Sequence, residues 1–217
     1  MKKLVALILL AGGLSAAPQV LDCLAAVVNN RSITLVDVRV AETFGIFDEE
    51  IRDRPGVRRR LILEKLIDQK VVLDLVREPA VPDESELAAA VSGIISRLGS
   101  EEFVASLREF DFDRDDLAAY LGETLLFRRV LAARFEQGVT VSLREIEAHY
   151  QNVYLPAMRE AGRDPEPFLQ VLDDIEAEIK TTKKAVMIEE WIAHIRSQAE
   201  IRILPDCLDN EFQEKAP

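Results

Sequence analysis

VLDCLAAVVNNRSITLVD, residues 20–37, is the stretch that decides the fold. Its apolar, β-branched part is followed by the polar residues 29–32, which tolerate turn backbone, and the chain then returns. Thr34 with Asp37 three residues later is an N-cap with an acidic box, so the pattern predicts a hairpin that runs directly into a helix. A lone hairpin is marginal in water, and the alternating residues 199–204 are the predicted third strand.

Most of the remaining chain has the apolar spacing of amphipathic helices. Capping boxes that begin at Asp83, Asp113 and Ser142 predict three helix starts, and a long last helix is predicted over residues 166–199. We therefore predict a mainly α protein, a helical module with a small antiparallel sheet. The N-terminal hairpin and the C-terminal strand form that sheet.

The N-terminus has the layout of a secretory signal peptide. Lys2 and Lys3 precede an apolar run that ends in small residues at Ala17. This run is too short to span a bilayer, so we predict cleavage, export and no later membrane insertion; the alternative is an uncleaved anchor. The chain carries 39 acidic and 27 basic residues, a formal net charge of −12. Such a surface repels nucleic acid and anionic lipid, and we exclude both as partners.

The two cysteines, Cys23 and Cys207, lie near the start of the first predicted strand and just after the last one. In an antiparallel pair, the start of one strand lies beside the end of the other. Because exported proteins hold disulfides, we hypothesise a Cys23–Cys207 bridge that closes nearly the whole mature chain. The alternative is two unrelated thiols, since Pro205 and Asp206 can turn Cys207 away.

Several runs resemble the SurA-type periplasmic chaperones, which assist outer-membrane proteins in Gram-negative bacteria. APQVLDCLAAVVNNRSITLVDV, residues 17–38, resembles the start of the mature family members, and RLILEKLIDQKVVLDLVR, residues 60–77, resembles their second helix. Residues 82–134 resemble the remaining helices of the N-terminal module. EEWIAHIRSQAEIRIL, residues 189–204, resembles the C-terminal helix and strand that complete the module. The resemblance implies a periplasmic location and binding of unfolded polypeptides without ATP.

The chain departs from this family between its two ends. The family normally carries one or two parvulin domains there, which are peptidyl-prolyl isomerases, whereas residues 140–163 are typical of one helix. The resemblance therefore implies a chaperone core without isomerase domains. Its implied parts are a signal peptide (1–17), an N-terminal helical module (18–138), a helical insert in place of the parvulin domain (139–165), a C-terminal helix and strand that complete the module (166–204), and an acidic tail that we expect to be disordered (205–217).

The sequence contains no recognisable catalytic or metal-binding constellation. The only histidines, His149 and His194, lie on different predicted helices, and no phosphate loop, nucleophile elbow or zinc motif occurs. We predict no enzyme activity, no metal and no cofactor. Client binding requires exposed apolar surface, although aromatic stripes at helical spacing more often face the core. The candidate client-binding residues are Phe44, Phe47, Phe103, Phe110, Tyr150 and Tyr154.

The expected function is that of an ATP-independent holdase for unfolded outer-membrane or secreted proteins. Two alternatives from other classes stay open at this point. One is a protein related to peptidyl-prolyl isomerases with degenerate activity. The other is a structural or assembly protein that binds one fixed partner, including a second copy of itself as a swapped homodimer.

Overall fold

The computed structural model describes residues 23–51, 57–76, 82–135, 138–204 and 206–209. The predicted signal peptide and most of the predicted tail, with its expected disorder, lie outside the described residues. The fold is mainly α with one small antiparallel sheet, as predicted. Its elements are β1 Leu24–Val28, β2 Arg31–Thr34, α1 Leu35–Thr43, α2 Asp48–Ile51, α3 Arg58–Asp74, α4 Glu84–Leu98, α5 Ser100–Glu109, α6 Arg114–Phe135, α7 Leu143–His149, the π-helical η2 Tyr150–Tyr154, α8 Leu155–Glu160, α9 Phe168–Arg196, β3 Ile201–Ile203 and α10 Asp206–Asp209.

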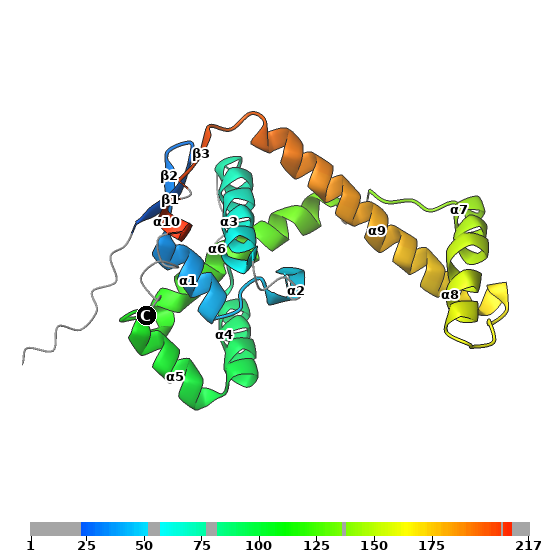
Figure 1. Cartoon of the computed structure of the whole chain (residues 1–217), viewed down its shortest axis with the longest axis horizontal. Coiled ribbons are helices and arrows are strands. Elements are labelled where there is room, and N and C mark those ends of the chain that lie inside the picture. The colour runs from blue at the N-terminus through cyan, green and yellow to red at the C-terminus, as the bar shows by residue number, and fades with distance from the viewer. Residues whose placement is uncertain (1–22, 52–56, 77–81, 136–137, 205, 210–217) are drawn as a thin grey trace, which may run out of the picture.

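The sheet brings the two ends of the chain together. Its strand order is β2-β1-β3, and β1 pairs antiparallel with both neighbours, so that Val28 lies opposite Arg31 on one side and Ile201 on the other. Asn29 makes the tight turn with a φ of 51°, and its side-chain oxygen accepts a hydrogen bond from the backbone N–H of Glu200 at 2.9 Å. The predicted pairing of hairpin and C-terminal strand is therefore confirmed (Figure 1).

Local capping starts the helices where the sequence predicts. Thr34, Asp83 and Ser142 are N-caps with complete capping boxes. In each box the side chain at the third helical position also accepts a hydrogen bond from the N-cap backbone N–H. These contacts satisfy N–H groups that a helix start otherwise leaves without partners.

Two apolar clusters hold the helical module, which we define as β1 to α6 together with β3 and α10. The first cluster joins the sheet to α1, α3, the C-terminal half of α6 and the end of α9, with Ile33, Val38 and Ile67 fully buried. The second joins α1 to α4, α5 and α6 around Phe44 and Phe103. Each helix therefore buries its apolar stripe against at least one other element.

We define the arm as α7, η2, α8 and α9. The 29 residues of α9 extend over about 43 Å at the usual rise per residue. Figure 1 shows α9 projecting from the module to a tip, where α7 packs against its N-terminal part; α7 continues through η2 into α8. A third cluster around Ile146, Val171 and Ile175 holds this tip.

Ionic and aromatic contacts fix the base of the arm to the module, and a disulfide within the module joins the two ends of the chain. Cys23 and Cys207 form a disulfide with their Cα atoms 5.9 Å apart, which agrees with the hypothesis from the sequence. Arg196 of α9 forms ion pairs with Glu64 and Asp68 of α3. The indole of Trp191 packs against Phe135 at the end of α6, with 5.6 Å between ring centroids.

Candidate functional site

Three of the predicted client-binding rings are buried. Phe44, Phe47 and Phe103 are 0%, 3% and 1% exposed. The rings of Phe44 and Phe103 meet edge to face with their centroids 6.0 Å apart, a favourable geometry for core aromatics. These three candidates are therefore core residues, because α4, α5 and α6 cover the face of α1 that carries Phe44 and Phe47 packs in the cluster that contains α3.

The other three predicted rings are half-buried and have structural partners. Phe110 packs between Phe44 and Phe112, with the guanidinium of Arg39 5.7 Å from its ring centroid. Tyr150 and Tyr154 stack on one another at the tip of the arm, with centroids 5.4 Å apart.

The tyrosine hydroxyls also fix the loop that precedes α9. The Tyr150 hydroxyl donates to the carbonyl of Glu166 at 2.8 Å, and the Tyr154 hydroxyl accepts from the N–H of the same residue at 3.2 Å. Both rings therefore order the tip and leave only part of their surface for a ligand.

The exposed apolar side chains are different residues from the predicted ones. Leu169, next to the half-buried Phe168 at the start of α9, is 81% exposed. Helical periodicity places Phe168 and Val171 on the apolar face of the helix. It does not reveal that no other element covers Leu169. The large hydrophobic residues that are exposed comprise Leu24, Val57, Leu75, Val104 and Ile203 on the module and Leu143, Val153, Leu169, Val186 and Met187 on the arm and the segment leading into it.

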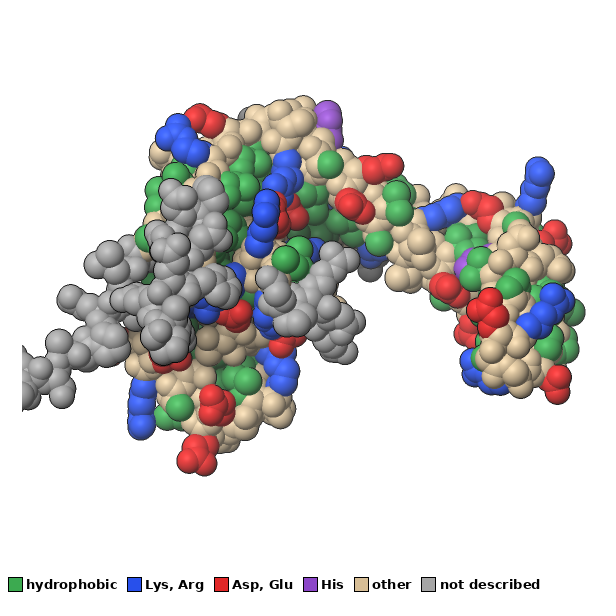
Figure 2. Space-filling model, in the orientation of Figure 1, with side chains coloured by type: hydrophobic (Ala, Val, Ile, Leu, Met, Phe, Trp, Pro, Cys, Tyr) green, Lys and Arg blue, Asp and Glu red, His purple; other side chains and the backbone are tan. Residues whose placement is uncertain are grey.

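These side chains form separate groups on the surface. Figure 2 shows hydrophobic side chains on the module under the C-terminal half of α9 and again around the tip, with charged side chains along the arm between them. Val186 and Met187 lie on the intervening part of α9. An extended apolar polypeptide can contact several such groups at once, whereas a small ligand cannot.

A hollow of about 320 Å³ lies between α2, α4 and α6. Its apolar lining comes from residues spaced along one face of each long helix, and its charged lining comes from Glu49, Arg97 and Arg128. The apolar residues and glycines that line it are Gly45, Ile46, Ala90, Gly93, Ile94, Leu121 and Leu125. The sequence analysis did not identify this site; the only signal for it is the run of small residues in α4.

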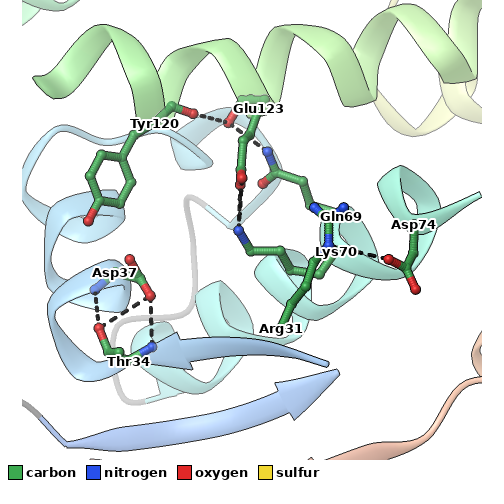
Figure 3. Close-up of polar contacts among 9 residues, drawn as sticks. Arg31, Thr34, Asp37, Gln69, Lys70, Asp74, Tyr120 and Glu123 are labelled. Carbon is green, nitrogen blue, oxygen red and sulfur yellow. Dashed lines mark hydrogen bonds and ion pairs between the residues drawn. The ribbon is translucent and has the colours of Figure 1, made fainter. Parts of the chain in front are cut away.

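A polar network next to this hollow ties α3 to α6 (Figure 3). The buried Gln69 donates through its amide to the hydroxyl of Thr124 at 3.4 Å, and its amide oxygen has no partner among the described residues. Lys70 bonds both carboxylate oxygens of Glu123, at 2.7 and 2.9 Å. These contacts set the spacing of α3 and α6, which is a structural role.

Of the four described carboxyl groups whose pKa values are shifted by their surroundings, two lie on the arm or at its base. Burial raises the pKa of Asp68, although its partner Arg196 acts in the opposite direction. At the arm tip, the ammonium of Lys183 and the capping contacts of Ser142 lower the pKa of Glu145 to about 2. Neither group lies at a reaction centre; both join elements of the arm or of its base.

The histidines have structural contacts. His149 lies 3.4 Å from a carboxylate oxygen of Glu178, and the ring of His194 lies 3.1 Å from the amide of Gln198. In the part of the chain that the structure describes, no group of three or more histidine, cysteine or acidic side chains is placed to hold a metal ion.

No protein-family model matches the chain, and no curated protein matches it. Within the described residues, no helix combines the length and the apolar character needed to cross a bilayer. The SurA-type resemblance of the sequence thus stays a prediction, and functional inference depends on the geometry.

Proposed function

We propose that this protein is an ATP-independent holdase of the periplasm that binds unfolded outer-membrane or secreted polypeptides. The observation that carries the proposal is the distribution of exposed apolar side chains along the arm, from Val186 and Met187 to Leu169 at the tip. Such dispersed contacts suit extended chains of varied sequence, because no one pocket has to be matched.

Two further features support this proposal. The Cys23–Cys207 disulfide is of a kind that persists in oxidising compartments, which agrees with an exported protein. The formal net charge of −12 gives a loaded complex mutual repulsion and so keeps it in solution. Burying each client side chain against the arm contributes about 1.5–3 kcal/mol when the side chain is fully covered, so partial contacts remain reversible.

The proposal is tested by light scattering of a urea-denatured porin diluted into buffer with the purified oxidised chain. We expect suppression of aggregation near equimolar ratio. Replacing Leu169 and Met187 with Gln should weaken the suppression, because both remove exposed apolar surface without opening the core. Gln170→Ala, at the exposed position next to Leu169, is the matched control and should leave it unchanged. Unchanged scattering with the wild-type chain would refute the holdase proposal.

The two other classes of function predict different results. Residues 138–167, all described, form α7, η2 and α8 with their connecting loops and contain no strand of the kind that a parvulin sheet needs. We therefore expect no acceleration of proline isomerisation in a model peptide, and a measurable acceleration would favour the isomerase alternative. Stable capture of one folded partner, with no affinity for unfolded chains, would favour the assembly role.

A further inference from the structure

The hollow between α2, α4 and α6 exists because α4 presents small residues to it. Ala90 and Gly93 face the space in front of Leu121 and Leu125 of α6, and Ile46 lines it from the segment before α2. A Cβ atom added at Gly93 would meet no atom within 4 Å, so this position borders open space. A larger residue there would fill the hollow.

Although the chain as a whole is acidic, most of the charged side chains that line the hollow are basic. Arg97 from α4 and Arg128 from α6 lie on it, together with one acid, Glu49. In the described ranges, neither arginine has an ion-pair partner. The nearby acid Asp48 is paired with Arg58.

One of these arginines is held in place by the backbone. Arg97 donates through Nη2 to the carbonyl of Phe44, at the C-cap of α1, which leaves its other N–H donors available. Arg128 is exposed on the opposite wall. The hollow therefore combines an apolar floor with two guanidinium groups that can donate hydrogen bonds to a carboxylate.

We propose that this hollow binds one large apolar client side chain together with an adjacent carboxylate, that is, an apolar-acidic segment of an unfolded polypeptide. This inference rests on the proposed holdase function and adds a sequence preference to it. The volume of about 320 Å³ is near the lower end of the range of about 300–1,000 Å³ for small-ligand sites, so it admits side chains and not a folded partner. The two arginines on its walls favour a segment that carries a carboxylate beside its apolar side chain.

The test uses two fluorescein-labelled peptides that differ only in a central Phe-Asp or Phe-Asn pair. Both are acetylated and amidated, so the aspartate is the only carboxylate that differs. Fluorescence anisotropy with the purified oxidised chain should show about three- to fivefold tighter binding of the Phe-Asp peptide at low salt, the ratio expected for one exposed charged contact. The preference should shrink as salt screens the guanidinium groups.

Two variants and two matched controls locate the site. Arg128→Gln should remove most of the preference, and Gly93→Leu should weaken both peptides by filling the hollow. Arg108→Gln makes the same charge change on the exposed face of α5, and Ser92→Leu adds the same side chain at an exposed position of α4; both should bind like wild type. Circular dichroism and melting temperature verify that each variant is folded.

The outcomes separate this inference from the proposed function. Equal binding of the two peptides to wild type, or a preference that survives both Arg128→Gln and Gly93→Leu, overturns the hollow as the site. If the chain nevertheless suppresses porin aggregation, the holdase proposal stands without this preference. If aggregation is not suppressed, the holdase proposal fails independently of the peptide result.

Discussion

Removing the disulfide should cost the protein a large share of its stability. Cys23 and Cys207 are 184 residues apart, and the chain-entropy model for a closed loop of this length gives about 5 kcal/mol at 25 °C. A domain typically has a total stability of about 5–15 kcal/mol, so this loss is a third of the total or more. The physical origin is the unfolded chain, which gains freedom when its two ends are no longer joined.

The measurement is urea unfolding followed by circular dichroism on the oxidised wild type and on the Cys23→Ser/Cys207→Ser double variant. We expect a lower midpoint for the variant and a larger dependence on urea, because the unlinked unfolded chain exposes more surface. Dithiothreitol should lower the urea midpoint of the wild type to that of the variant and should leave the midpoint of the variant unchanged. A loss below about 1 kcal/mol would refute the chain-entropy reasoning and would mean that sheet pairing and ion pairs alone hold the ends together.

Three further changes test the contacts that position the arm and the first helix. Arg196→Ala should lower the free energy of unfolding by about 1–3 kcal/mol in urea titrations, because it leaves the partly buried carboxylate of Asp68 without its partner; no loss would contradict the role assigned to this contact. Thr34→Ala should lower the free energy of unfolding by about 1 kcal/mol, because it removes the N-cap of α1. Thr34→Ser keeps a hydroxyl at the N-cap and should retain most of this stability. Folding lowers the pKa of Glu145 to about 2, so the charged carboxylate stabilises the folded state at pH values above the ordinary pKa of a glutamate. This stabilisation is lost as the pH falls toward 2. Its carboxyl ¹³C NMR titration should therefore have a midpoint near 2 in the wild type, and in Lys183→Gln the midpoint should move up toward the ordinary value; an unmoved midpoint would exclude Lys183 as the cause.

Local sequence signals predicted much of the backbone. The capping boxes at Thr34, Asp83 and Ser142 begin helices at the predicted positions, since these contacts lie within a few residues of one another. The meeting of hairpin and C-terminal strand was also predictable, because a two-stranded hairpin needs a third strand and residues 199–204 have the alternation of one. The positions of the two cysteines followed from the same pairing.

The functional surface was much less predictable. The aromatic residues chosen from helical spacing include Phe44 and Phe103, which are buried, while the most exposed large apolar side chain is Leu169. The hollow with Arg97 and Arg128 on its walls also escaped prediction, because its lining comes from elements far apart in the sequence.

The sequence by itself determined where the helices begin, that the two ends pair, and which face of each helix is apolar. Only the tertiary structure decided which apolar faces are covered and which remain open to a ligand. The reason is physical: periodicity and capping depend on residues a few positions apart, whereas burial depends on which distant element packs against a face. Gly93 shows this clearly, since its missing side chain matters only because α2 and α6 enclose the space beside it.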